Sequence, residues 1–418
     1  MVHSGDPIFR LGLVTLFGNF LAFAYRTYLV IYLDEDLMTS ALILSILVSL
    51  VNFMQIPFRV PFGKLSQAIG RKPIIVTGIA LYTVSIFVLG FSTDWRHALV
   101  SVLLFGTGMS CFWPATFSFI GDVSLGSYGR SNGRIFQMGD VGVILGSLLA
   151  DYFLDTISLD LSQFYLVIGF IGLGFTFLGM ILLPESLTPE DRISVENPFS
   201  FFIHSISKVV RTVAQLTTYP KLLPVYSFQI LISFAAFGFI SFFPSLFVSY
   251  GYSRGDVGLI SLYATLILIF FKPFLGSLSD RFSLRTVVTV GLILISASIT
   301  LTTLTTDFFG LLMIQCIFLG AMIASYTSVN KGSAARAPTS QRGSALGVLG
   351  VYVSLGRAMS TMYVGFLYNS FTLEVSFRIF SFSIVGMLGL VFVSIGREPK
   401  FFISIENHNA QRIKPKTH

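Results

Sequence analysis

Long apolar runs alternate with short polar segments along this chain, and the alternation predicts its architecture. A helix of roughly 20 apolar residues is long enough to cross a bilayer. Twelve such runs follow one another, with a longer polar segment after the sixth. The pattern predicts an all-α membrane protein with transmembrane helices at Ile8–Tyr32, Ser40–Phe62, Pro73–Phe91, His97–Ile120, Gly133–Leu154, Ser162–Leu183, Leu222–Val248, Val257–Leu275, Arg285–Thr305, Phe308–Val329, Ser344–Leu367 and Arg378–Ile395.

The composition agrees with a membrane protein. Only 11% of the 418 residues are charged and 54% are apolar, whereas about 25% of the residues of a soluble domain are charged. The net charge of +7 does not indicate nucleic-acid binding, because the basic residues lie in short segments between apolar runs. We therefore expect a monomer that works in the lipid bilayer and binds no nucleic acid.

The short polar segments differ in charge from one side of the predicted bundle to the other. Segments on one side hold most of the Lys and Arg residues, whereas those on the other side are mainly acidic, as in Asp34, Glu35 and Asp36. Basic loops stay in the cytoplasm by the positive-inside rule. The sequence thus predicts a multi-pass protein of the cell membrane with both termini in the cytoplasm.

One basic segment occurs twice, about half the chain apart. Residues Gly63 to Lys72 read Gly-Lys-Leu-Ser-Gln-Ala-Ile-Gly-Arg-Lys, and residues Gly276 to Arg285 read Gly-Ser-Leu-Ser-Asp-Arg-Phe-Ser-Leu-Arg. Matching residues beyond these segments share nearly the same offset, such as Gly106 with Gly320. The repetition favours two halves of six helices each.

The doubled segment resembles the signature between helices 2 and 3 of the major facilitator superfamily of transporters, Gly-x-Leu-x-Asp-Arg-x-Gly-Arg-Arg/Lys, and its weaker second copy. The resemblance implies two pseudo-symmetric six-helix bundles with a substrate site between them. It divides the chain into a first bundle (1–184), a cytoplasmic linker with an amphipathic helix (185–221), a second bundle (222–397) and a cytoplasmic tail (398–418). It further implies that Gly63 and Gly276 let neighbouring helices approach closely at a cytoplasmic gate.

The two copies differ in the charges that such a gate needs. The second copy has Asp280 and Arg281, and we expect Asp280 near the start of the fifth helix, beside Arg134. The first copy has Gln67 where the family has Asp, so its charge contact with the eleventh helix is lost or reduced. The predicted gate contains Gly63, Gln67, Gly70, Arg71, Lys72, Gly276, Asp280, Arg281, Arg285 and Arg134. The alternative is that its basic residues only fix the topology.

Ionisable residues inside the predicted helices indicate a site, because each costs at least about 2.5–3.5 kcal/mol at a helix centre. Asp140, Arg26 and Arg357 lie away from helix ends, whereas Arg59 and Lys272 lie near ends and are expected to extend toward the surface. Polar or aromatic neighbours complete the candidate substrate and proton site: Asn19, Gln137, Gln315, Tyr326 and Trp113.

These residues suggest a mechanism with open alternatives. Asp140 would take up a proton, while Arg26 and Arg357 would attract an anionic or hydroxyl-rich solute. Alternatively, Asp140 forms a structural ion pair with an arginine, or contacts the substrate itself. We expect a secondary transporter of a small organic solute, working by alternating access and driven by a proton gradient, with no enzyme activity, cofactor or bound metal. A multidrug efflux antiporter and a transporter-like sensor or scaffold are the alternatives.

Overall fold

The computed structural model describes residues 6–124, 128–194, 197–217, 222–336 and 342–395. Within these ranges the chain folds into helices joined by short turns, and no strand occurs among the described residues. The predicted all-α class is therefore confirmed. The predicted tail, 398–418, lies outside the described residues.

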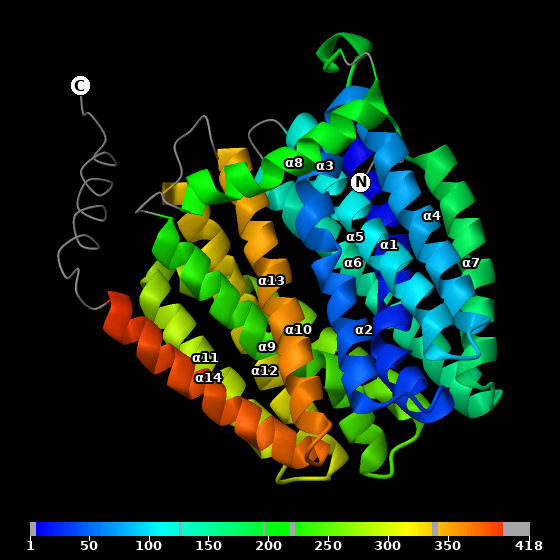
Figure 1. Cartoon of the computed structure of the whole chain (residues 1–418), viewed down its shortest axis with the longest axis vertical. Coiled ribbons are helices and arrows are strands. Elements are labelled where there is room, and N and C mark those ends of the chain that lie inside the picture. The colour runs from blue at the N-terminus through cyan, green and yellow to red at the C-terminus, as the bar shows by residue number, and fades with distance from the viewer. Residues whose placement is uncertain (1–5, 125–127, 195–196, 218–221, 337–341, 396–418) are drawn as a thin grey trace.

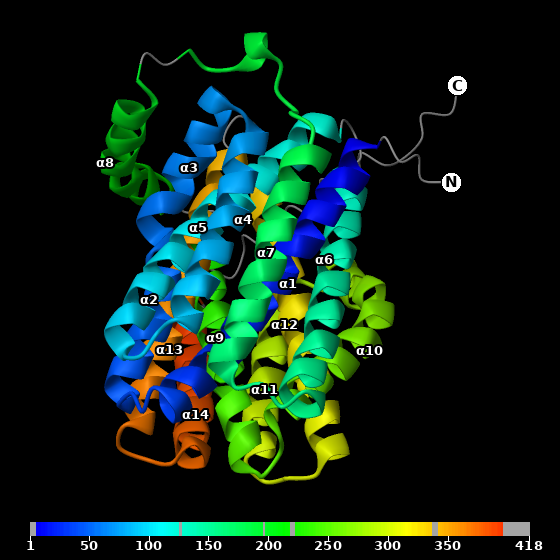
Figure 2. The same cartoon turned by 90° about the vertical axis from the view of Figure 1, so that its right-hand side faces the viewer.

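Two groups of long helices lie side by side (Figures 1 and 2). The N bundle contains α1 (Pro7–Ile31), α2 (Ala41–Phe53), α3 (Gln55–Ile69), α4 (Arg71–Gly90), α5 (Trp95–Val123), α6 (Tyr128–Asp151) and α7 (Leu161–Leu182). The C bundle contains α9 (Leu223–Ser249), α10 (Arg254–Arg281), α11 (Leu284–Thr302), α12 (Phe308–Arg336), α13 (Arg342–Tyr368) and α14 (Leu373–Ile395). Short η1 (Tyr32–Asp36) and η2 (Tyr152–Thr156) extend α1 and α6, and η3 (Pro189–Asp191) precedes α8 (Pro198–Thr217).

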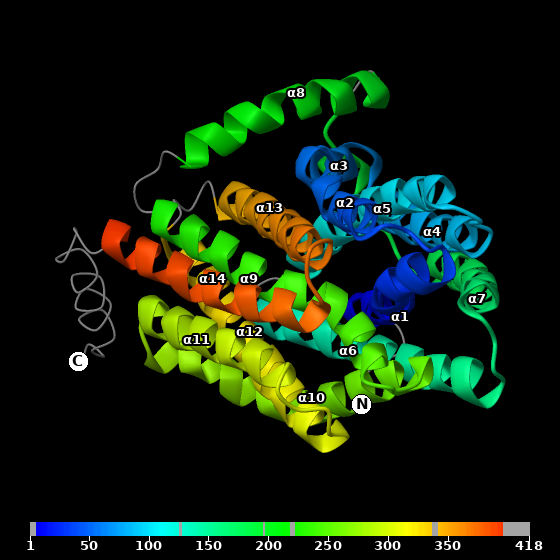
Figure 3. The same cartoon turned by 60° about the horizontal axis from the view of Figure 1, so that its bottom comes forward.

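Helix α8 connects the bundles and lies across one end of the molecule, outside both of them (Figure 3). We call this end the connector face and the opposite end the far face. Phe202 of α8 packs on Phe58 and Phe62 of α3, with ring centroids 6.1 and 4.7 Å away. Phe199 and Ile203 on the outer side of α8 are exposed. This two-sided pattern is typical of a helix at a membrane surface.

Nine helical segments within the described residues are long and apolar enough to cross a membrane. The long helices α6, α13 and α14 are not among the nine. Helices α6 and α13 contain Asp140 and Arg357 together with several glycines, which lower their hydropathy. The count of twelve spans and the four-part division of the chain therefore stay predictions.

The second predicted span differs from its expected form. It is interrupted at Met54 and forms two consecutive helices, α2 and α3. Pro57 has no N–H to donate, and its ring crowds the carbonyl of Phe53, where α2 ends. Helix α3 then continues to Ile69, beyond the predicted end at Phe62. Most of the first signature copy is therefore helical, and only Gly70 links α3 to α4, with a φ of 113° that favours glycine.

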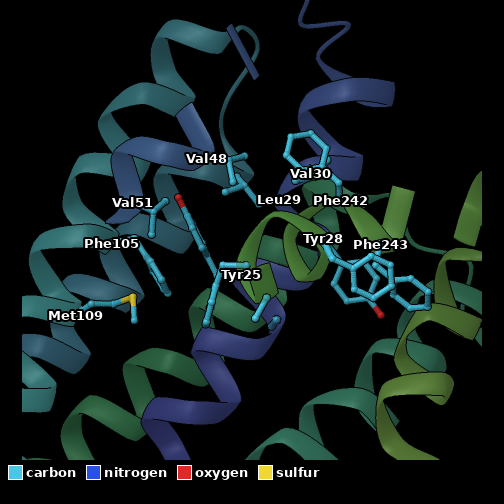
Figure 4. Packing of buried hydrophobic residues seen from close by; sticks show 14 of the residues in the cluster. Tyr25, Tyr28, Leu29, Val30, Val48, Val51, Phe105, Met109, Phe242 and Phe243 are labelled. Carbon is cyan, nitrogen blue, oxygen red and sulfur yellow. The ribbon is translucent and has the colours of Figure 1, made fainter. Parts of the chain in front are cut away.

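Buried aromatic residues fill the N bundle and its boundary with the C bundle. Tyr25 stacks on Phe105 with ring centroids 4.0 Å apart, and its hydroxyl lies 2.9 Å from that of Ser101. Figure 4 shows Tyr28 and Val30 of α1 near Phe242 and Phe243 of α9. The packing brings α1 and α9 together at the centre of the molecule.

Short polar turns at the far face begin the helices there. Asp94 caps α5 by accepting from the N–H groups of Arg96 and His97, at 2.8 and 3.2 Å. The N–H groups of His97 and Arg96 hold the pKa of Asp94 below its ordinary value. Asp160 begins α7 with a capping box to Gln163. These caps fix where the helices start.

Candidate functional site

Two arginines from different bundles lie over one phenylalanine ring. The guanidinium carbon of Arg357 on α13 is 3.8 Å from the centroid of Phe237 on α9, and that of Arg26 on α1 is 5.5 Å from it. A guanidinium is attracted to the face of an aromatic ring. The two guanidinium carbons can therefore be no farther apart than the sum of these distances. The structure brings together two of the site residues predicted from the sequence.

A third arginine approaches the same region from α3. The position that a Cβ would take on Gly350 of α13 lies 2.7 Å from Nε and 2.9 Å from Cζ of Arg59. The guanidinium of Arg59 thus lies against the backbone of α13, in the opposite bundle. The expectation that Arg59 extends toward the surface was wrong, because the missing side chain of Gly350 leaves room for it between the bundles.

A row of hydrogen bonds lies beside Arg357 within the C bundle. The side chain of Gln229 donates to the hydroxyl of Ser233 at 2.9 Å, and this hydroxyl lies 2.8 Å from that of Tyr326, which lies close to Arg357. Two polar atoms at the ends of the row have no partner among the described residues, Nε of Arg357 and Oε1 of Gln229. Buried polar atoms are normally paired. Nε of Arg357 can therefore donate a further hydrogen bond, and Oε1 of Gln229 can accept one.

The charges of these arginines are not balanced by nearby acids. Among the described side chains, no carboxylate forms an ion pair with Arg26, Arg59 or Arg357. Arg357 lies close enough to each of the other two for their charges to repel. Positive charges between apolar helices that have no ion-pair partner are costly. The three residues, which we call the arginine cluster, therefore form a site that an anion would stabilise.

A small cavity adjoins the arginine cluster on the side toward the far face. Its volume is about 20 Å³, which accommodates about one water molecule. It is lined by Arg26, Leu29, Val48, Val51, Asn52 and Ser241, which come from both bundles. The three arginine side chains themselves are partly exposed. The site is thus nearly closed beyond Arg26, while the arginines remain accessible.

The other charged candidate, Asp140, has a partner in the opposite bundle. Its carboxylate on α6 accepts a hydrogen bond from the ammonium group of Lys272 on α10. The side chains of Lys272 and Asp140 are 28% and 17% exposed, so the pair is largely shielded from solvent. The alternative of an Asp140–arginine pair and the expectation that Lys272 reaches the surface were both wrong. The ion pair joins the two bundles.

The remaining predicted site residues are dispersed. Asn19 packs over Gly139 of α6, with Nδ2 2.6 Å from the position of a Cβ there. Gln137 is exposed on α6, and Gln315 on α12 is buried with an unpaired Oε1. Trp113 stacks on Phe117 and Phe136, with ring centroids 5.6 and 5.9 Å away. Of the predicted candidates, only Tyr326 belongs with Arg26 and Arg357.

Further charged contacts between the bundles lie at the far face. Arg254 at the start of α10 pairs with Glu35 and Asp36 of η1, with N···O distances of 2.8 and 2.9 Å. The hydroxyl of Tyr368 on α13 donates to Asp34 at 2.9 Å. The acidic end of α1 therefore holds two helices of the C bundle.

The end of α6 makes a similar contact through its own extension. Asp155 of η2 accepts hydrogen bonds from the hydroxyl of Ser253 and, at 3.1 Å, from the N–H of Gly255. Both donors belong to the first turn of α10 or its cap, where unpaired N–H groups attract a carboxylate. The far face is thus closed around the start of α10.

Close packing continues this closure between α2 and α13. The hydroxyls of Ser49 and Thr361 lie 2.9 Å apart, and Gly365 faces Ser45 so closely that a Cβ would lie 3.0 Å from Cα of Ser45. Only glycine allows this approach. Figure 1 shows the far-face ends of α2 and α13 side by side.

The first signature copy makes its contacts inside the N bundle. Nε of Arg71 lies 3.0 Å from Oδ2 of Asp122 at the end of α5, and the side chain of Arg71 is only 6% exposed. Glu185 accepts hydrogen bonds from the N–H groups of Arg71 and Lys72, at 2.9 and 3.3 Å. A side chain at Gly70 would collide with this carboxylate. The side chain of Gln67 is exposed, and its backbone carbonyl accepts a hydrogen bond from the N–H of Ile193, which follows η3, at 3.1 Å.

The second copy shows no close approach of helices. A Cβ on Gly276 would have no atom within 4 Å, and a Cβ on Gly63 would make only an ordinary contact with Pro114 of its own bundle. The expected close packing at these two glycines is therefore absent from this conformation. Arg134 and Arg281 are exposed, and Arg285 is half-buried. The side chain of Asp280 lies outside the described part of the structure, so its contact with Arg134 stays a prediction.

Sequence reasoning missed three members of the central site. Phe237 is one of 44 phenylalanines, and nothing in the sequence distinguishes it. Arg59 and Lys272 occupy equivalent places in the two halves, a signal that could have indicated a shared central position. Both side chains instead reach across to the other bundle.

Two bundles of membrane-crossing helices with polar residues between them are the arrangement of a multi-pass secondary transporter. The family model of the Major Facilitator Superfamily matches residues 11–253 and 225–402. This chain belongs to the Major Facilitator Superfamily. Membership implies a transporter rather than an enzyme.

Comparison with individual proteins agrees with this assignment. The chain is 26% identical to a probable nitrate transporter of Staphylococcus haemolyticus over 65% of this chain and 66% of the relative. It is 22% identical to multidrug resistance protein 2 of Bacillus subtilis, over 81% and 83% of the two chains. The solved nucleoside transporter NupG superposes with a TM-score of 0.76 at 12% identity, over 93% of this chain and 100% of the other, which shows the fold alone.

Proposed function

We propose that this protein transports a small anionic solute across the cell membrane by alternating access, as a monomer. The observation that carries this proposal is the arginine cluster, in which Arg26 and Arg357 from opposite bundles share the ring of Phe237. An anion between them would neutralise charge that nearby acids leave unbalanced. The similarity to a probable nitrate transporter supports an anionic substrate.

Contacts between the bundles suggest which way the site opens. The charged contacts that join the bundles end to end lie at the far face, where Arg254 pairs with Glu35 and Asp36. Basic residues are concentrated at the connector face, which the positive-inside rule assigns to the cytoplasm. The conformation then faces inward, with both termini in the cytoplasm and the far face closed toward the outside.

The Asp140–Lys272 pair offers a route for proton coupling. A proton on Asp140 would remove the negative charge that holds Lys272 and would loosen the contact between α6 and α10. Since these helices belong to different bundles, the loss of this contact favours their relative movement. Proton uptake and the change between inward and outward states would thus be linked through one ion pair.

Transport assays in proteoliposomes test the anion site. Wild-type protein should exchange a labelled anion across the membrane, and Arg26→Gln or Arg357→Gln should reduce this exchange by about 100-fold or more, because charge-assisted hydrogen bonds are lost. Arg96→Gln is the matched control, since Arg96 stacks on Trp95 at the far face, away from the cluster. Full activity of both cluster variants would refute the anion site.

Coupling is tested separately with Asp140→Asn. This variant should lose accumulation driven by a pH gradient but retain exchange between equal concentrations, because exchange needs no net proton movement. Glu190→Gln, an exposed residue of η3, serves as the control. Unchanged pH-driven accumulation by Asp140→Asn would exclude Asp140 as the coupling group.

Export of amphipathic drugs is a second candidate function. It is favoured by the aromatic group of Trp113, Phe117 and Phe136, of which Phe136 is 42% exposed, and by the similarity to a multidrug resistance protein. Transport of a lipophilic cation into proteoliposomes, at a rate that added anions do not reduce, would support drug export. A sensor or scaffold role requires that no solute crosses the membrane at all.

A further inference from the structure

Positive charge occurs at two levels along α13. Arg59 of the N bundle lies against Gly350, and Arg357 of α13 itself follows seven residues later in the sequence. Seven residues of α-helix span about 10 Å, or two turns. Because a long helical side chain leans toward the start of its helix, the guanidinium of Arg357 covers the turn before its own Cα. The two charges are thus separated by less than two turns.

The two levels differ in their surroundings. The guanidinium of Arg357 lies with that of Arg26 beside the ring of Phe237 and keeps an unpaired Nε. The guanidinium of Arg59 lies against the backbone of α13 at Gly350, and no carboxylate among the described residues forms an ion pair with it. A single anionic group at Phe237 would leave the charge of Arg59 unbalanced. A solute with two anionic groups would neutralise both levels at once.

We propose that the transported solute is a dianion, with one anionic group at Arg26 and Arg357 and the other at Arg59 beside Gly350, and that Arg59 selects dianions over monoanions. The proposal rests on the anion transport proposed above. Short dicarboxylates have the required chemistry, with one carboxylate for each level. Their anionic oxygens accept paired hydrogen bonds from guanidinium groups.

Ligand binding to the purified full-length protein tests this selectivity. Thermal stability is measured at constant ionic strength with malonate, succinate, glutarate and glycerol phosphate, and with the matched monoanions acetate, butyrate, monomethyl glutarate and nitrate. For wild-type protein, at least one dianion should stabilise at a concentration about 10-fold or more below that of its matched monoanion. The chain length that binds best reports the spacing. Glycerol phosphate, whose two charges lie on one phosphate group, tests whether two separate anionic groups are needed, and it should show no such advantage over a monoanion.

Variants at Arg59 assign the preference to this residue. Arg59→Gln should weaken the binding of the preferred dianion about 10-fold or more and the binding of its matched monoanion by less than about 3-fold. The preference for the dianion is then lost. Arg59→Lys should retain part of it. Gly350→Ala offers a second route, because its Cβ would lie 2.7 Å from Nε of Arg59 and displace the guanidinium without removing its charge. Arg96→Gln should behave as wild type.

The outcomes separate this inference from the proposed function. If monoanions and dianions bind wild-type protein equally well, or if Arg59→Gln and Gly350→Ala both keep the preference, the inference is wrong while anion transport stands. Equal weakening of both ligand classes in Arg59→Gln also overturns it, since Arg59 would then serve the same anionic group as Arg357. If no anion stabilises the wild-type protein and none is carried across the membrane by it, the proposed anion transport itself is refuted.

Discussion

The two ends of the molecule differ in the direction of their charged contacts. At the far face, Arg254 of the C bundle pairs with Glu35 and Asp36 of the N bundle. At the connector face, Arg71 pairs with Asp122 inside the N bundle. Apart from the Asp140–Lys272 pair, charged contacts between the bundles among the described residues thus lie at the far face, and the charged contacts of the signature segment stay within one bundle.

This difference indicates that the contacts at the two ends have different roles. Contacts between bundles have to form and break when a site opens alternately to two sides, whereas contacts within a bundle keep it rigid while it moves. The far face has the features of a gate in its closed state. The Arg71–Asp122 contact of the first signature copy, which we call the brace, lies within one bundle in this conformation. The resemblance to the family motif implied a gate at this segment, and this stays a prediction.

The largest effect is expected where the far face packs most closely. Gly365→Val would place side-chain atoms into Ser45 and should prevent far-face closure, because neither backbone can withdraw without separating α2 from α13. Spin labels at Thr156 and Ser370, both exposed at the far face, should report a longer distance, and transport should be lost. Gly386→Val is the control, since a Cβ there meets no atom within 4 Å. An unchanged label distance would contradict the closed gate.

A smaller effect is expected from the brace at the connector face. Arg71→Gln leaves Asp122 without its ion-pair partner and should lower the free energy of unfolding by about 2 kcal/mol, less than for a fully buried pair because Asp122 is partly exposed. The far-face label distance should stay the same. Arg71→Lys, which keeps the charge, should recover part of the stability. A changed label distance would mean that Arg71 belongs to the gate.

The length of apolar runs predicted the positions of most helices. The expected span Pro73–Phe91 is α4 at Arg71–Gly90, and the expected span Arg285–Thr305 is α11 at Leu284–Thr302. Hydropathy succeeds here because the bilayer fixes the length of an apolar helix. It does not reveal which side of a helix faces the opposite bundle.

This limit explains the errors at the site. A lysine or arginine near a helix end is compatible both with the surface and with the centre, so Arg59 and Lys272 were misplaced. The partner of Asp140 lies 132 residues away in the sequence, in the other bundle. Only the crossing of α6 and α10 brings the two together. Arg26 and Arg357, which meet at Phe237, became candidates because charge in the middle of an apolar run has no other common explanation.

A still smaller effect is expected from the ion pairs of Arg254 at the far face. Arg254→Gln removes the pairs with Glu35 and Asp36 and should shift the equilibrium toward far-face opening by about 1 kcal/mol, since the side chains are partly exposed. The fraction of the longer Thr156–Ser370 label distance should rise about five-fold. High salt should reduce the difference between variant and wild type. Arg96→Gln lies at the same face within the N bundle and should leave the fraction unchanged; an equal rise there would assign the effect to net charge.

The smallest effect is expected at the exposed side chain of Gln67, where one substitution would add a charged contact between the bundles at the connector face. Gln67→Asp restores the acid of the family pattern near the end of α3, a helix that contacts α13. The N–H groups at the start of α13 carry partial positive charge. The added attraction of about 0.3–1 kcal/mol should favour closure of the connector face and raise the fraction of far-face opening about two- to five-fold. Gln67→Asn has the same size without the charge and should behave as wild type. If Gln67→Asp matches Gln67→Asn, the first signature copy serves only as a brace, and gating at this end has to depend on the second copy.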